Sequence, residues 1–98
     1  MIVRVVKMTF RPEEVRRFQQ LFEEWAPQIR SSPGCLYLEL LHDMNDPRIF
    51  FTYSQWEKIS DLDDYRVSSV FSSVWPTVKT LFAEPAVAWS VVREHRAV

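Results

Sequence analysis

Two apolar segments, CLYLELL (residues 35–41) and IFFTYSQW (residues 49–56), decide the fold. Both are rich in the aromatic and branched residues that favour strands. Between them, His42–Pro47 carries the Asp, Asn and Pro residues that are typical of a turn. The sequence therefore predicts a β-hairpin with a loop of medium length.

Both faces of this hairpin are predicted to be apolar. Alternate residues of a strand point to opposite faces, which separates Cys35, Tyr37 and Leu41 from Leu36, Leu38 and Leu40, and Phe51 and Tyr53 from Phe50 and Trp56. A sheet that is apolar on both faces must cover both, and a chain of 98 residues can cover the second face only with another copy. We therefore expect a homodimer that packs sheet against sheet.

The chain before the hairpin predicts a strand and then a helix. Ile2–Phe10 is rich in Val, and the Arg11-Pro12 pair after it ends the strand where proline can open a helix. Apolar residues then recur at helical spacing from Val15 to Ile29. Pro27 is expected to kink or loosen the last turns, and Ser31–Gly34 closes the segment.

The chain after the hairpin predicts a second helical region and a last strand. Ser60 with Asp63 fits a capping box, and apolar residues follow at helical spacing as far as Phe82. Pro76 and four serines interrupt this region, so one helix and two shorter helices both fit. Residues 86–93 predict the final strand. The order β-α-β-β-α-β is that of an α+β, ferredoxin-like domain spanning residues 1–98, with four antiparallel strands and helices on one face.

Composition excludes several classes of function. The single glycine, Gly34, cannot supply the glycine-rich turns of nucleotide-binding sites, and a net charge of -1 without charge blocks predicts no nucleic-acid partner. One cysteine, Cys35, allows no internal disulfide and no Cys-based metal site. No segment has the length of a membrane span or the pattern of a leader, so a cytoplasmic protein without a membrane partner is expected.

Several motifs resemble the antibiotic biosynthesis monooxygenase family of dimeric α+β barrels. These are Pro33-Gly34-Cys35, Leu38-Glu39-Leu40, Asp46-Pro47, Phe51-Thr52-Tyr53-Ser54 and Trp56-Glu57, the spaced residues Leu62, Tyr65, Ser68 and Phe71, and then Leu81-Phe82 and Ala88-Trp89-Ser90-Val91. The resemblance covers nearly the whole chain, and no single motif is diagnostic of one reaction. It implies a dimer and a ligand pocket between sheet and helices.

Two branches of that family can be compared residue by residue. The haem-degrading branch uses a Trp on the second helix, an iron-ligating His ten residues later and an Asn on the first strand. This chain has Tyr65, then Trp75, and no Asn in residues 2–10, so haem degradation of that type is rejected. The anthrone-oxidising branch has a Trp that Trp56 matches, and an Asn where this chain has Thr52.

The resemblance implies a cofactor-independent monooxygenase that acts on a small electron-rich aromatic of the quinol, anthrone or polyphenol type. The candidate catalytic residues are Tyr65, Trp56 and His42, the last as a general base. Candidate substrate-binding residues are Thr52, Tyr53, Arg66, Phe71, Trp75, Phe82 and Trp89. No metal and no organic cofactor is expected.

Other interpretations remain open. The chain could be a dimer that binds a small ligand or a partner without turnover, or an enzyme that breaks down small oxo-compounds. Most aromatic residues could simply be core, and His42 and Arg66 could be solvated surface groups. Glu39 could pair with Arg4 inside the protein or lie at the dimer interface. Cys35 and His42 are expected on opposite faces of one strand, too far apart to react together.

Overall fold

The computed structural model describes residues 1–98 and contains the predicted hairpin as β2 (Cys35–His42) and β3 (Ile49–Trp56). The loop between them is held by Asp43, whose Oδ2 accepts hydrogen bonds from the backbone N–H groups of Asn45 and Asp46 at 2.9 and 2.8 Å. Arg48 closes the turn through an ion pair with Asp46 at 2.8 Å. The turn chemistry of the sequence is thus used as predicted.

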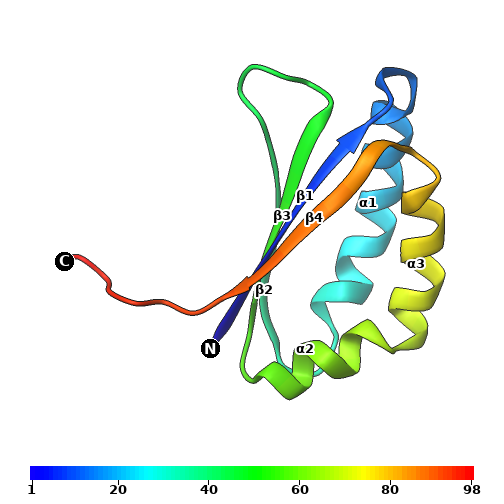
Figure 1. Ribbon diagram of the computed structural model, residues 1–98. Helices are drawn as coiled ribbons and strands as arrows, with labels where there is room; N and C mark the ends of the chain where they lie inside the picture. The colour runs from blue at the N-terminus through cyan, green and yellow to red at the C-terminus, as the bar shows by residue number, and fades with distance from the viewer.

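Four antiparallel strands form one sheet in the order β2-β3-β1-β4. The first strand, β1 (Ile2–Phe10), lies in the centre between β3 and β4 (Phe82–Val91). All the helices lie on one side of this sheet (Figure 1). The predicted ferredoxin-like α+β fold is therefore confirmed.

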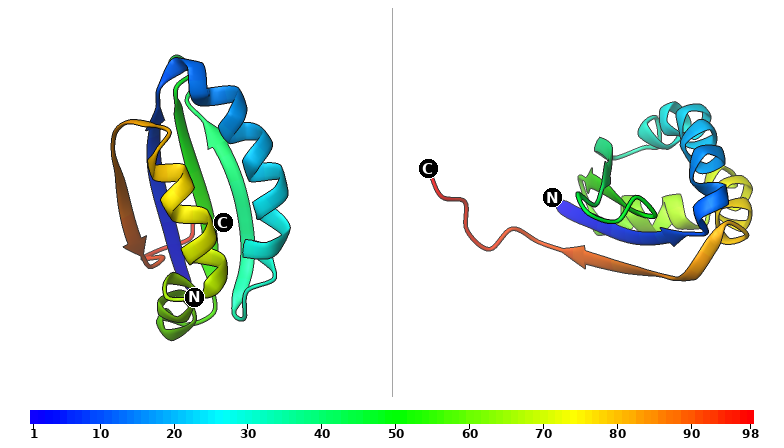
Figure 2. Two further views of the ribbon diagram at one scale, coloured as in Figure 1. Left: turned by 90° about the vertical axis from the view of Figure 1, so that its right-hand side faces the viewer. Right: turned by 90° about the horizontal axis from the view of Figure 1, so that it is seen from above.

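The helices divide the covered face between them. A 3-10 turn, η1 (Pro12–Glu14), leads into α1 (Val15–Arg30), which lies on the β2 side of the sheet. The two shorter helices, α2 (Ile59–Arg66) and α3 (Ser69–Lys79), follow β3, and α3 lies on the β4 side (Figure 2). None of these helices is long and apolar enough to cross a membrane.

The second helical region is two helices, broken at Val67-Ser68 rather than at Pro76, which lies inside α3. Ser68 makes the break, because its hydroxyl donates to the carbonyl of Tyr65 at 2.6 Å and accepts from the N–H of Phe71 at 3.3 Å. The predicted capping pair Ser60 and Asp63 is wrong. The helix begins at Ile59, two residues before the start that a Ser60 cap implies, and Asp61 Oδ2 accepts from the N–H of Lys58 at 3.2 Å.

The last strand begins at Phe82, four residues before the predicted start, and ends at Val91. The helical spacing of Leu81 and Phe82 was misleading, because both residues pack into the core from a loop and a strand. Beyond the strand, residues 92–98 lead away from the sheet on the side opposite the helices (Figures 1 and 2). Pro27 does not end α1, which continues to Arg30.

The first residues of β2 contain an irregularity that changes the predicted faces. Cys35 pairs with Trp56 while Tyr37 pairs with Gln55, so one extra residue is accommodated there. Cys35 is buried on the helix side, whereas Tyr37 is exposed on the other. The prediction that they share a face is wrong. Cys35 and His42 instead lie on the same face but at the two ends of the strand, about 20 Å apart, so they still do not pair.

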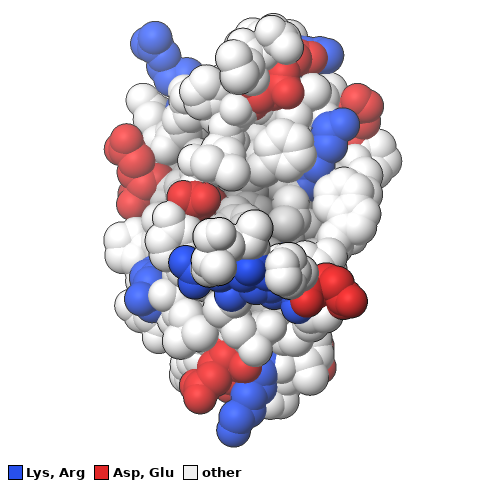
Figure 3. Space-filling model, turned by 90° about the vertical axis from the view of Figure 1, so that its left-hand side faces the viewer, with Lys and Arg blue, Asp and Glu red and all other residues white.

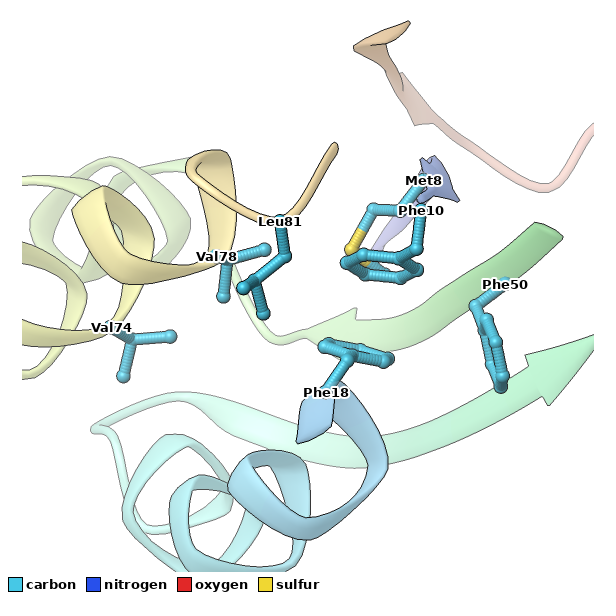
Figure 4. Close-up of a cluster of buried hydrophobic side chains, with 7 residues drawn as sticks. All are labelled: Met8, Phe10, Phe18, Phe50, Val74, Val78 and Leu81. Carbon is cyan, nitrogen blue, oxygen red and sulfur yellow. The ribbon is translucent and has the colours of Figure 1, made fainter. Parts of the chain in front are cut away.

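The core lies between the sheet and the two long helices. Its centre consists of seven buried residues: Met8, Phe10, Phe18, Phe50, Val74, Val78 and Leu81 (Figure 4). Phe10 stacks on Phe18 with ring centroids 4.1 Å apart, and Phe50 meets both rings edge-on. A smaller cluster of Cys35, Trp56 and Leu62 lies at the α2 end. The core and the cavity described below share this one layer.

The outer face of the sheet has no cover. Tyr37, Leu41, Val87, Trp89 and Val91 are between 42 and 47% exposed on it. Most of the surface seen from this side belongs to uncharged residues, with charged groups scattered over it and a hollow near its middle (Figure 3). Glu39 lies on this face and accepts a hydrogen bond from the Tyr37 hydroxyl at 2.6 Å, so it does not pair with Arg4.

Candidate functional site

A cavity of about 300 Å³ lies between the sheet and the helices. Of its 20 lining residues, 16 are hydrophobic, which is the usual make-up of a pocket for a small organic molecule. The sheet contributes Arg4, Val6, Met8, Leu38, Thr52, Ser54, Trp56, Ala86 and Ala88. The helices contribute Phe18, Phe22, Trp25, Ile29, Leu62, Tyr65, Arg66, Phe71, Val74, Trp75 and Val78.

A row of four aromatic rings forms one wall of the cavity. Trp56 stacks on Tyr65 with centroids 5.1 Å apart, and Tyr65 meets Phe71 edge-on at 5.4 Å. Phe71 stacks on Trp75 at 5.8 Å and 17°. The break at Ser68 sets this row, because its hydroxyl bonds both Tyr65 and Phe71 at the junction of α2 and α3.

The sheet supplies Arg4, Thr52 and Ser54 as polar lining residues, in addition to Tyr65 and Arg66 from α2. Arg4 lies opposite Ser54 on β3 and opposite Ser90 on β4, so three polar side chains cross the sheet at one level. The Arg4 Nη1 donates to Ser90 Oγ at 2.9 Å. Ser54 is buried, donates to the carbonyl of Arg4 at 3.5 Å, and accepts from Trp56 Nε1 at 3.0 Å. The Trp56 ring is therefore fixed by both packing and a hydrogen bond.

Tyr65 and Cys35 are both un-ionised at neutral pH. Burial, with a smaller contribution from the nearby Cys35, raises the pKa of the Tyr65 hydroxyl to about 12. Burial also raises the pKa of the Cys35 thiol. Tyr65 can therefore donate a hydrogen bond or a proton in the cavity, but it cannot serve there as a base at neutral pH.

Six of the ten residues proposed from the sequence line the cavity: Thr52, Trp56, Tyr65, Arg66, Phe71 and Trp75. The other four lie elsewhere. Tyr53 is on the outer face, where its ring meets Tyr37 at 6.1 Å, and Trp89 is exposed on that face. Phe82 packs in the core between Phe10 and Trp75. His42 is exposed at the edge of the sheet beside Phe50, with Nδ1 3.0 Å from the carbonyl oxygen of Asp43.

Sequence reasoning missed Arg4, Ser54 and Trp25 as lining residues. A usable signal existed for Ser54, because Thr52, Ser54 and Trp56 alternate along one strand and must share a face. Arg4 also carried a signal, since it is a cation inside an otherwise apolar strand. Trp25 belongs to the apolar stripe of α1, where nothing in the sequence separates core from cavity wall.

A second hollow lies between the end of α1 and α2. It has nine lining residues, of which two are hydrophobic, and it includes Asp61, Asp64 and three serines. Tyr65 is its one aromatic lining residue, so it has no row of rings on which a flat ligand could stack. Elsewhere, no group of three His, Cys, Asp or Glu side chains is placed to hold a metal ion.

The fold and this cavity define the class of protein. It is a ferredoxin-like α+β protein with an aromatic-lined cavity between its sheet and helices. A sequence model of the antibiotic biosynthesis monooxygenase family matches residues 1–74. The chain belongs to that family.

Solved structures agree with this assignment. An antibiotic biosynthesis monooxygenase aligns over 95% of this chain and 98% of its own, with a TM-score of 0.88 and 20% identity. A conserved protein from Methanosarcina mazei Go1 aligns over 96% and 94%, with a TM-score of 0.89 and 20% identity. Rv0793 from Mycobacterium tuberculosis aligns over 99% of this chain and 98% of its own, with a TM-score of 0.88 and 16% identity. A comparison with curated proteins finds no match. At these identities, the structures establish the fold alone.

Proposed function

We propose that this protein is a cofactor-independent monooxygenase that oxidises a small electron-rich aromatic, of the quinol, anthrone or polyphenol type, with dioxygen. The observation that carries the proposal is the continuous row of rings from Trp56 through Tyr65 and Phe71 to Trp75. Flat ligands bind well to such a wall, because stacked and edge-on ring contacts add to the burial of apolar area.

The chemistry is that of a stabilised carbanion with dioxygen. In an anthrone, loss of a proton from the ring CH2 gives an enolate, which transfers an electron to dioxygen. A carbon–oxygen bond then forms to give a peroxide, and the O–O bond breaks. One oxygen atom becomes the new carbonyl and the other leaves as water with the two hydrogens of the CH2 group. An apolar cavity limits the contact of the intermediates with water.

The polar residues of the cavity have matching tasks. The Thr52 hydroxyl can hydrogen-bond a substrate oxygen, since it offers one donor and two lone pairs. The protonated Tyr65 can donate to the oxygen on which negative charge develops, or to the departing peroxide oxygen. Trp56 supplies a fixed ring against which the substrate can stack.

One observation favours a second candidate, a dimer that binds an aromatic ligand without turnover. No carboxylate and no histidine is among the lining residues, so the cavity contains no ordinary general base. The two histidines lie outside it, His42 exposed at the edge of the sheet and His95 exposed beyond the end of β4. Either the substrate enters already ionised, or the protein does not catalyse.

An oxygen electrode distinguishes the two candidates. We expect oxygen uptake that depends on added anthrone or quinol, and that falls at least tenfold in Tyr65→Phe and in Thr52→Val. The matched control is His42→Ala, which lies outside the cavity and should keep the rate. Quenching of tryptophan fluorescence by the same compounds with no uptake on any of them would contradict the oxygenase and support the binding protein. Turnover of small oxo-compounds without oxygen uptake would contradict both.

We also propose that residues 1–98 act as one domain that forms a homodimer through the outer face of the sheet. The uncovered side chains Tyr37, Leu41, Val87, Trp89 and Val91 support this, because such a patch is costly to expose to water. Sedimentation at micromolar concentration should give a dimer, and Trp89→Glu should shift it toward the monomer. A wild-type monomer at that concentration would contradict the proposal.

A further inference from the structure

Arg4 is a cation in the cavity whose charge nothing in the chain neutralises. Its side chain leaves β1 near the start of the strand, on the helix side, and is half-buried. The three ion pairs of the protein involve Arg11 and Arg48. None of the 20 lining residues is acidic. Glu39 follows the lining residue Leu38 in the sequence, but its side chain lies on the outer face of the sheet.

The second cation of the cavity adds to this imbalance. Arg66, at the end of α2, lines the cavity and is itself exposed at its edge. Burial and the Arg66 charge both lower the pKa of the Arg4 guanidinium below its usual value, and no acid raises it. A half-buried cation beside a like charge is unfavourable unless an anion joins it. The cavity is therefore electrostatically complementary to a negatively charged ligand.

The hydrogen bonds around Arg4 leave donors available. A guanidinium carries five N–H donors, and the one bond from this side chain goes to Ser90. That bond orients the group, since Ser90 and Ser54 flank Arg4 on the neighbouring strands. The hydroxyl of Ser54 is already used by the Arg4 carbonyl and Trp56 Nε1. The remaining guanidinium N–H groups are the strongest donors for a ligand on the sheet side of the cavity.

We propose that Arg4, assisted by Arg66, binds an anionic oxygen of the ligand, so that the natural ligand is a flat aromatic bearing a carboxylate or an ionised phenol or enol. The inference rests on the proposed function in one respect, that the ligand is the same aromatic. The aromatic wall holds the ring system, and the two arginines hold its charged oxygen. A ligand that binds as an anion also needs no base in the cavity, which accounts for the absence of one.

Binding of matched probes tests this without requiring turnover. Naphthalene-2-carboxylate and its neutral carboxamide have nearly the same shape, and their dissociation constants can be measured by quenching of tryptophan fluorescence. For the wild type, we expect the carboxylate to bind at least about tenfold more tightly, as is typical of a charge-assisted hydrogen bond. Arg4→Met should remove that preference and leave carboxamide binding within about twofold.

Three further variants complete the design. Arg4→Lys keeps the charge and should keep part of the preference, which separates loss of charge from damage to the fold. Arg66→Gln should reduce the preference by a smaller factor, because Arg66 is exposed and its charge is screened. Arg17→Met is the matched control on the exposed face of α1 and should change nothing. Circular dichroism confirms that each variant is folded.

A dye identifies the kind of anionic oxygen. 2-Hydroxyanthraquinone changes colour when its phenol ionises, and it is added at a pH where the free dye is protonated. Appearance of the ionised spectrum with wild type but not with Arg4→Met assigns a phenolate, whereas carboxylate binding without a spectral change assigns a carboxylate. Equal affinity for the carboxylate and the carboxamide, with no ionised dye, overturns the inference. These readouts report binding and not turnover. A preference for the anion without oxygen uptake would support this inference and contradict the oxygenase, and oxygen uptake without that preference would do the reverse.

Discussion

The layer between the sheet and the helices has two ends that the protein uses differently. At one end, Phe10 packs against the rings of Phe18 and Phe50 with no polar side chain among them, and of these three only Phe18 also lines the cavity (Figure 4). At the other, Trp56 and Tyr65 leave a cavity that also admits Arg4. Both ends are made of the same strands and are rich in aromatic residues. The difference lies in the polar groups and the unfilled space.

Because of this difference, we assign the stability of the fold mainly to the phenylalanine end and ligand binding mainly to the cavity end. Close packing at the phenylalanine end maximises buried apolar area and dispersion contacts. The cavity end gives up some of that packing and adds a half-buried charge, both of which are unfavourable until a ligand fills the space. We therefore expect mutations at the first end to affect stability mainly, and mutations at the second to affect binding mainly.

The largest expected effect is at the phenylalanine end. Phe10 is completely buried and contacts the rings of Phe18, Phe50 and Phe82. Phe10→Ala should lower the free energy of unfolding by about 3 to 5 kcal/mol, because it leaves a cavity that cannot collapse. Urea denaturation measures this, with Met44→Ala, at a 95% exposed position, as the control. A loss below about 1 kcal/mol would mean that this end is not the stabilising one.

The next effect concerns Gly34, which seats α2 over the cavity end. Its φ is 80°, and an added Cβ would overlap the Asp61 side chain. Gly34→Ala should therefore cost about 2 to 3 kcal/mol from backbone strain together with the clash. Measured in an Asp61→Gly background, which removes the Asp61 Cβ together with its carboxylate, Gly34→Ala should recover the part due to the clash. No recovery in the double variant would show that the close approach of α2 to β2 has been misjudged.

Ser54→Ala should have a smaller effect, about 1 to 2 kcal/mol, because it leaves the buried Trp56 Nε1–H without an acceptor. The exposed Ser73 on α3 provides the matched control, and Ser73→Ala should change stability by less than about 0.5 kcal/mol. Ser54→Ala should also weaken binding of naphthalene-2-carboxylate, since it no longer fixes the Trp56 ring by a hydrogen bond. Equal stability of the two variants would argue against that hydrogen bond.

The smallest effect depends on pH. The pKa of Tyr65 is about 12 in the fold against 10.0 for a free tyrosine, so the folded state holds this proton more tightly. Its contribution is constant below pH 10 and is lost as the pH rises toward 12, because the unfolded chain ionises first. At pH 11, the wild type should have lost about 1 kcal/mol more than Tyr65→Phe. Parallel stability curves for both proteins between pH 9 and 11 would contradict the burial of this hydroxyl.

Much of the fold could be predicted because it follows from local pattern. The alternation in Ile49–Trp56 fixes which residues share a face of the sheet, and the turn residues of His42–Pro47 fix the hairpin. The start of β4 could not be predicted. Leu81 and Phe82 continue the helical spacing of α3, and what ends that helix is a tertiary contact. The Arg11 backbone N–H bonds the Leu81 carbonyl, and the Arg11 side chain bonds the Thr80 carbonyl.

The cavity was partly predictable for the same reason. Trp56, Tyr65 and Phe71 were found by resemblance and spacing, and the structure brings them together. Tyr53 and Trp89 were chosen for their chemistry, whereas the alternation of their strands places them on the outer face. The irregular pairing after Cys35 leaves no mark in the sequence, since it depends on how β2 meets Trp56.

The tryptophans provide the most direct test of the central claim that the cavity end binds an aromatic ligand. Of the four in the chain, Trp25, Trp56 and Trp75 line the cavity, and Trp89 lies on the outer face. Their indole N–H resonances can be followed in a ¹⁵N–¹H spectrum during titration with naphthalene-2-carboxylate. The account predicts that the three cavity signals move together and saturate while that of Trp89 stays in place. Movement of Trp89 alone, or of none of the four, would contradict it.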